Sequence, residues 1–163
     1  EKWDQRWYMG LFQISNEPGF LTPTLYNYVG RPDKTAEVVR KTLKERYNTT
    51  KEGIPGNDDS GSMSSWYVFH ALGFYPNTGQ DLYLISSPTF EEVVIHLENG
   101  RDLSIKAKKA SDKNIYVQSV KLNGEPLDAC SFKHTDIANG GTLEFVMGSK
   151  PSKWGTVGVE NQL

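Results

Sequence analysis

The strongest constraint on the fold is a change of pattern near residue 80. Before it, apolar residues recur every three or four positions, as on one face of a helix. After it, short runs rich in β-branched and aromatic residues alternate with Pro, Asn-Gly and Gly-Gly breaks. A chain of 163 residues that is 37% hydrophobic can bury a core. We therefore expect a mixed α and β fold, with a helical part over residues 1–79 and an antiparallel β segment packed on it over residues 80–163.

Three helices are expected in the first part, over residues 22–29, 33–47 and 62–72. The second has Ala36, Val39 and Leu43 at helical spacing with Lys and Glu between them. The third contains no Asp, Glu, Lys or Arg and is rich in large apolar residues, which predicts a largely buried helix that Gly73 would end.

Strands are expected over residues 82–86, 93–97, 103–108, 115–122 and 143–147. Asn99-Gly100 and Asn123-Gly124 are typical of tight hairpin turns. Such turns join neighbouring antiparallel strands, so the sequence favours an antiparallel sheet with one face in water.

The charge balance excludes several classes of partner. Eighteen Lys and Arg residues face twenty Asp and Glu residues, which gives a net charge of −2 and no basic footprint for nucleic acid. No apolar stretch has the length needed to cross a bilayer, so we expect no membrane partner. The chain starts at Glu1 without an initiator Met or a leader, which suggests a processed product, an excised piece or a fragment.

Two features bear on the compartment. Cys130 is the only cysteine, so no internal disulfide can form, and its strand context favours a buried small hydrophobe. Asn48-Thr49-Thr50 is an N-glycosylation sequon in a polar, turn-like stretch. It points to a secreted or extracellular protein, or a periplasmic one if the source is bacterial.

The histidines do not form a metal site. His70, His96 and His134 have no mutual metal-ligand spacing, and the first two lie in an apolar helix and an apolar strand. We therefore expect structural histidines whose ring nitrogens are hydrogen-bonded.

A polar, glycine-rich stretch over residues 52–61 precedes the third helix and contains Asn57, Asp58 and Asp59. Local physics favours helix capping and turn formation for these aspartates. The alternative is a general base, held between a rigid helix and a glycine turn and kept ionised by the helix dipole. The next aromatic residue, Trp66, would wall a pocket in that case or simply fill the core.

A second polar group surrounds Asn16 and Glu17, and Pro18 is expected to hold Glu17 in an extended conformation, away from helix. Amide, carboxylate and backbone oxygens are ligands suited to calcium. An ordinary turn before a helix explains the same residues.

Taken together, these segments resemble the exo-α-mannosidases of glycoside hydrolase family 92. The resemblance rests on residues 14–18 (ISNEP), 25–32 (LYNYVGRP), 53–69 (GIPGNDDSGSMSSWYVF), 71–76 (ALGFYP), 87–90 (SPTF) and 122–124 (LNG), with weaker correspondence over 134–137, 140–143 and 150–152. It implies the last helices of an (α/α)6 barrel followed by the terminal β segment. The N-terminal β-sandwich, the rest of the barrel and the general acid would lie in a missing part of the enzyme.

The resemblance also implies a function for the two polar groups. It predicts calcium-dependent, inverting removal of terminal α-mannose from N-glycans or mannans, with α-1,2 linkages favoured, and Asp59 as the general base. Asp58 is the second candidate for the general base. Asn57 stands where relatives commonly have a second acid, so it can orient water but cannot take a proton. Asn16 and Glu17 match the calcium segment, and Glu17 and Trp66 are candidate substrate contacts.

The residues leave two other functions open. The chain could be a non-catalytic carbohydrate-binding module, or a structural fragment that is stable only on a partner chain. The rigid Gly-Asn-Asp-Asp-Ser-Gly loop favours the enzyme, whereas the absence of a general acid favours the alternatives if the chain acts alone.

Overall fold

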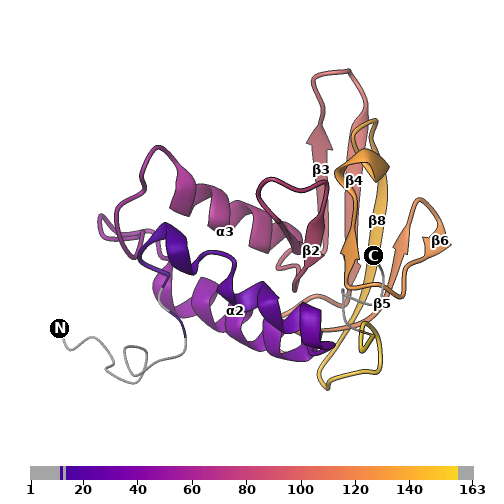
Figure 1. Ribbon diagram of the computed structural model, residues 1–163, viewed down its shortest axis with the longest axis horizontal. Coiled ribbons are helices and arrows are strands. Elements are labelled where there is room, and N and C mark those ends of the chain that lie inside the picture. Colours follow the sequence, from indigo (N-terminus) through magenta and orange to yellow (C-terminus); the bar gives the residue numbers. More distant parts are fainter. Residues whose placement is uncertain (1–11, 13, 158–163) are drawn as a thin grey trace.

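The computed structural model describes residue 12 and residues 14–157. Its helices are η1 (Glu17–Gly19), η2 (Thr22–Val29), α2 (Pro32–Arg46), α3 (Ser62–Leu72) and η3 (His134–Asp136), where η marks a 3₁₀ helix. Helices α2 and α3 lie side by side at one end of the molecule, and the longer strands form the other end (Figure 1). The three expected helices are confirmed, the first as a 3₁₀ helix. No helix among the described residues is both long and apolar enough to span a membrane.

The ends of the two long helices follow from local sequence. Pro32 occupies the first turn of α2, where backbone N–H groups have no acceptor within the helix, so proline loses no hydrogen bond there. Ala36, Val39 and Leu43 are buried, as their spacing predicted. Helix α3 ends at Gly73, whose φ of 103° lets its N–H donate to the carbonyls of the preceding turn.

The strands form two sheets. The first has the order β1-β2-β7, with β1 (Phe74–Pro76), β2 (Tyr83–Ile85) and β7 (Ser131–Phe132) all antiparallel. The second has the order β3-β4-β8-β5-β6, with β3 (Glu92–His96), β4 (Asp102–Lys108), β5 (Tyr116–Leu122), β6 (Glu125–Pro126) and β8 (Gly141–Gly148). All five expected strands are present, and both Asn-Gly pairs form hairpin turns, with positive φ at Gly100, Asn123 and Gly124. The short strands β1, β6 and β7 were not predicted.

One strand pair corrects the expectation of a purely antiparallel sheet. Strand β8 pairs with β4 in parallel, from Leu103–Gly141 to Lys108–Val146, and with β5 antiparallel. Hairpin signals report only on strands that are neighbours in sequence, whereas β5, β6 and β7 separate β4 from β8. The pairing places β8 in the middle of the sheet, where its Leu143, Phe145 and Met147 side chains are buried on one face.

A buried asparagine joins the helical and β parts. Asn27, in η2, donates from Nδ2 to the carbonyl oxygens of Ile85 (2.7 Å) and Cys130 (3.1 Å). Its Oδ1 accepts from Thr35 Oγ1 on α2 at 2.8 Å. Cys130 is buried as expected, and burial raises the pKa of its thiol to about 11. The helices are thus held at a fixed position on the three-stranded sheet.

Candidate active site

The loop before α3 has an unusual backbone. Asp59, Ser60 and Gly61 follow one another with φ values of 46°, 63° and 95°. Two of them are not glycine, and this left-handed conformation is costly for such residues. The turn is held by the Asp58 carbonyl oxygen, which accepts the N–H groups of Gly61 and Ser62 at 3.1 and 2.7 Å. The chain therefore presents Asp59 on a fixed turn at the start of α3.

The two aspartates have different surroundings. The Asp58 carboxylate accepts from Ser64 N at 2.8 Å and from Ser64 Oγ at 3.0 Å. Asp58 thus caps α3, which is the structural role that one aspartate was expected to take. The Asp59 side chain is exposed, while its carbonyl oxygen accepts from Ser62 Oγ at 2.7 Å. Of the two carboxylates, the one of Asp58 is therefore hydrogen-bonded to α3, whereas that of Asp59 projects into solvent.

Asp59 faces the second predicted group. Hydrogen bonding to the Glu17 side chain and repulsion from its charge raise the pKa of Asp59, with smaller contributions from desolvation and Asp58. A hydrogen bond between two carboxyl groups needs a proton on one of them, so this pairing favours protonated Asp59. None of the ion pairs seen among the described residues involves Asp59 or Glu17.

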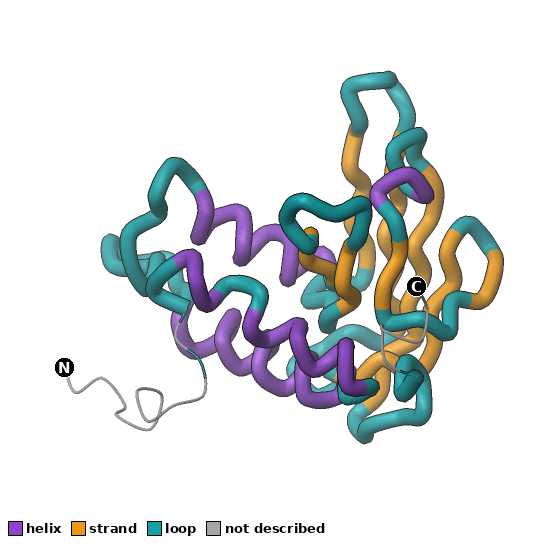
Figure 2. Tube along the Cα trace, viewed as in Figure 1, coloured by secondary structure: helices purple, strands orange, loops and turns teal. Residues whose placement is uncertain are grey.

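Close backbone contact brings these loops together. A Cβ on Gly56 would lie 2.4 Å from the Ser15 carbonyl oxygen, so only glycine allows the approach. Glu17 lies in η1 and is not extended, contrary to expectation, because Asn16 caps this short helix and its Oδ1 accepts the Glu17 N–H at 3.1 Å. Glu17 itself is exposed, next to Asp59. The two polar groups found separately in the sequence are one site in space, at the end of the helical part away from the five-stranded sheet (Figure 2).

Trp66 does not belong to the surface of this site. Its side chain is fully buried, donates from Nε1 to the Phe20 carbonyl oxygen at 3.0 Å and stacks on Tyr47. This burial corrects the expectation that Trp66 contacts substrate, since the indole packs behind the loop. Asn57 is exposed on the loop, where it remains available to orient a water molecule.

The histidines are structural, with one correction. His96 is exposed and lies 2.7 Å from Asp102, and His134 bonds to Tyr83 Oη at 3.0 Å. His70 is fully buried, and neither ring nitrogen has a hydrogen-bond partner among the described residues, contrary to expectation. Burial lowers its pKa to about 3.

The donor set suits a hard cation but is incomplete. Asn16, Glu17 and Asp59 offer only oxygen atoms, as calcium prefers, and the Asn16 amide oxygen already accepts one hydrogen bond. Within the described part of the chain, no group of three or more His, Cys, Asp or Glu side chains is placed to hold a metal. Calcium takes about six to eight oxygen ligands, so these residues fit only as part of its coordination shell.

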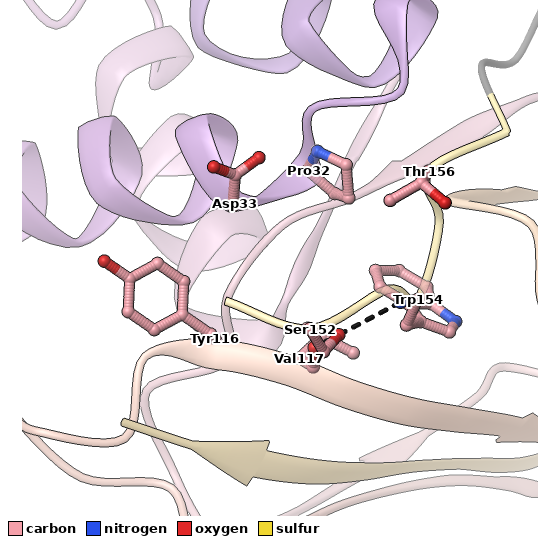
Figure 3. Close-up of a pocket in the computed structure, with 7 residues that line it drawn as sticks. All are labelled: Pro32, Asp33, Tyr116, Val117, Ser152, Trp154 and Thr156. Carbon is pink, nitrogen blue, oxygen red and sulfur yellow. Dashed lines mark hydrogen bonds between the residues drawn. The ribbon is translucent and has the colours of Figure 1, made fainter. Parts of the chain in front are cut away.

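Two cavities in the structure lie elsewhere. One of about 20 Å³ is lined by Pro32, Asp33, Tyr116, Val117, Ser152, Trp154 and Thr156, with Trp154 N donating to Ser152 Oγ (Figure 3). It is too small for a sugar. A larger one, of about 460 Å³, lies along α2 and includes Tyr67 but neither Asp59 nor Glu17. Asp59 and Glu17 are themselves exposed, so the candidate site lies at the surface of the described part of the chain.

Comparison with known proteins decides the family. The model of the glycosyl hydrolase family 92 catalytic domain matches residues 1–149. The chain belongs to glycoside hydrolase family 92. A family relative, described as an uncharacterized secreted glycosidase from Arthroderma benhamiae, is 41% identical over 149 residues, which are 90% of this chain and 19% of that protein.

Solved family 92 structures share the fold. The alpha-mannosidase BT3965 from Bacteroides thetaiotaomicron, in complex with mannoimidazole, is 35% identical with a TM-score of 0.87 over 93% of this chain and 20% of its own. The inverting mannosidase BT2199 from the same species is 35% identical with a TM-score of 0.80 over 87% of this chain and 20% of its own. The chain spans about one fifth of the length of these relatives.

Signals for some functional residues were absent from the sequence pattern. Ser64, which anchors Asp58, lies six positions away from it and matches no capping-box spacing. Gly56 lies in the glycine-rich stretch, but its contact with Ser15 depends on how the two loops pack in space.

Proposed function

We propose that this chain is the C-terminal part of a calcium-dependent, inverting exo-α-mannosidase that removes terminal α-mannose, in α-1,2 linkage, from N-glycans or mannans. Membership of a family with an alpha-mannosidase and an inverting mannosidase supports the reaction class. The chain covers one fifth of these relatives, so the activity is that of the whole protein. A secreted relative supports an extracellular location.

One observation carries the assignment of the base. Of the two aspartates on the loop, Asp58 is bound to α3, while Asp59 is exposed beside Glu17. A general base must reach a water molecule, which an exposed carboxylate on a fixed turn can do. The raised pKa of Asp59 makes it a stronger proton acceptor than a free aspartate.

The mechanism assigns roles to the residues of this chain. Asp59 takes the proton from the water that attacks the anomeric carbon, and Asn57 orients that water. Asp58 holds the turn through Ser64. An acid from the rest of the protein protonates the leaving oxygen on the opposite face of the sugar. Inverting enzymes place the two carboxyls about 6.5–9.5 Å apart, which leaves room for the water.

Asn16 and Glu17 would hold the calcium ion together with ligands from outside this chain. When bound, calcium would supply a hard cation for the mannose hydroxyls and so help distort the ring. The N-terminal β-sandwich and the remaining helices of an (α/α)6 barrel, of which α2 and α3 would be the last, are the proposed partners. They would close the exposed edge around Asp59.

The experiment compares Asp59→Ala with Asp58→Ala in the full-length protein, with mannose release from α-1,2-mannobiose as the readout. A general base contributes on the order of 10²–10⁴-fold to rate, so we expect a kcat loss in that range for Asp59→Ala. Asp58→Ala should lose less, because it weakens the turn without removing the base. Near-normal release by Asp59→Ala would contradict the assignment, and mannose binding without release by the wild type would favour a binding module.

A further inference from the structure

The turn that follows α2 carries a feature that catalysis does not use. Residues 48–50, Asn-Thr-Thr, form the single Asn-x-Ser/Thr sequence in the 163 residues, and all three are exposed. They follow directly after Tyr47, the residue that caps the end of α2 at Arg46. The neighbouring positions, Thr49 and Lys51, are not proline, so the sequon is chemically competent.

The backbone of this turn orients the acceptor side chain. Thr50 N donates to Asn48 Oδ1 at 2.9 Å, and Asn48 N donates to the Gly53 carbonyl oxygen at 3.1 Å. The amide oxygen of Asn48 is therefore turned onto the chain, and Nδ2 takes no part in either bond. Thr50 Oγ1 makes only a long contact of 3.5 Å with Glu52. The two groups that define a sequon, the amide nitrogen and the hydroxyl, are thus both at the surface.

We infer that Asn48 carries an N-linked glycan when the protein passes through a eukaryotic secretory pathway. The step forms a bond from Asn48 Nδ2 to the anomeric carbon of an oligosaccharide donated by a lipid diphosphate. It breaks the bond from that carbon to the diphosphate, which leaves with its electron pair, and Nδ2 loses one proton. The relative from Arthroderma benhamiae that is described as a secreted glycosidase supports passage through such a route.

The glycan has a structural consequence for the whole protein. A branched sugar cannot be packed inside a protein, so the end of α2 at Asn48 must face solvent when the rest of the enzyme is present. The missing part would then cover other surfaces, such as the exposed apolar side chains of Val29 and Val68. This inference does not depend on Asp59 or on the proposed reaction.

The test uses the full-length protein secreted from yeast. Trypsin cleaves after Arg46 and after Lys51, so it releases residues 47–51 as one peptide, which contains one asparagine. Peptide N-glycosidase in water labelled with heavy oxygen should convert Asn48 to labelled Asp in most molecules. An unlabelled, unmodified Asn48 peptide would overturn the inference.

Two matched threonines provide the control. Thr50→Val removes the hydroxyl that the transferase requires but keeps the backbone N–H that bonds to Asn48. Thr49→Val removes an equally exposed hydroxyl that it does not require. We expect Thr50→Val to abolish labelling and Thr49→Val to retain it. Equal labelling of both variants would show that the sequon does not direct the modification. Mannose release is measured on the same two variants, and equal release by both would show that the glycosylation result is independent of the proposed activity.

Discussion

The carboxyl groups of Asp59 and Glu17 face each other across two loops that are distant in sequence, and Glu17 raises the pKa of Asp59. The contact exists because Gly56 lets the loop before α3 approach the backbone of Ser15. In a family 92 enzyme, this pairing links the proposed base to the proposed calcium segment. The charge of Glu17 therefore affects the pH at which Asp59 becomes active as a base.

The first prediction concerns Glu17→Gln in the full-length enzyme. A base works only when deprotonated, so activity falls as pH drops through the pKa of Asp59. Glu17 raises that pKa, and the neutral variant should move the acidic limb of the kcat profile to lower pH. Profiles are measured at saturating mannobiose over a series of calcium concentrations, because a calcium ion bound at Glu17 would offset its charge. The shift should therefore be largest at the lowest calcium concentration that supports turnover.

Glu125→Gln serves as the control, because this exposed carboxylate lies on β6, at the edge of the five-stranded sheet and outside the candidate site. It should leave the limb where it is in the wild type. An acidic limb that stays in place in Glu17→Gln would disprove the electrostatic link between Glu17 and the base.

The second prediction tests how Asp58 holds the turn. Asp58→Ala removes the acceptor for Ser64 N and Oγ, and losing a helix cap costs about 1 kcal/mol. Ser64→Ala removes only the hydroxyl bond, so it should cost less. Urea unfolding of the protein measures both, and exposed Ser65→Ala on the same helix is the reference. A larger loss for Ser64→Ala than for Asp58→Ala would contradict the capping role.

Local signals in the sequence account for much of the helical part. Gly61 and Gly73 frame α3, and the expected bounds of residues 62–72 match the observed helix because both glycines take left-handed conformations. The buried face of α2 likewise follows from the spacing of Ala36, Val39 and Leu43. These signals act within one element, which is why the pattern of residue types is enough.

Contacts between segments that are distant in sequence could not be predicted from the pattern of residue types. The parallel pairing of β4 with β8 joins strands separated by three others, and no turn motif encodes it. The burial of Trp66 depends on the Phe20 carbonyl and the Tyr47 ring, both from other elements. For the candidate site, the residue types indicated a base and oxygen ligands, but their proximity depends on how two loops pack.

The third prediction tests the joint between the helical and β parts. Asn27→Asp keeps the shape of the side chain but removes the Nδ2 donor to Ile85 O and Cys130 O. The Cys130 carbonyl oxygen keeps its bond from Ile85 N at 2.9 Å, whereas loss of the buried donor costs about 1–3 kcal/mol and a buried carboxylate that faces carbonyl oxygens adds to this. We expect a loss of about 3 kcal/mol or more in the free energy of unfolding. Exposed Asn57→Asp should change it little, and similar losses for both variants would rule out a special role for Asn27.

The fourth prediction concerns His70, which lies between the Trp66 and Tyr75 rings at centroid distances of 4.2 and 4.8 Å. Its folded pKa of about 3 is below the ordinary value of 6.5, because burial disfavours the charged ring. The unfolded chain therefore takes up a proton first as pH falls. The stability contributed by neutral His70 is present above about pH 6.5 and is lost as pH drops toward 3, by about 1.4 kcal/mol per pH unit.

His70→Leu should remove this part of the acid sensitivity, whatever its effect on stability near neutral pH. Thermal unfolding from about pH 7 to about pH 4 measures the slope in the wild type and the variant. Exposed His96→Gln is the matched control, since His70 must still take up its proton when that variant unfolds. The two buried ring nitrogens have no partner that could stabilise a charge, so the wild type should lose stability faster than His70→Leu on acidification. Parallel slopes for wild type and His70→Leu would mean that the ring reaches water or a partner before the fold opens.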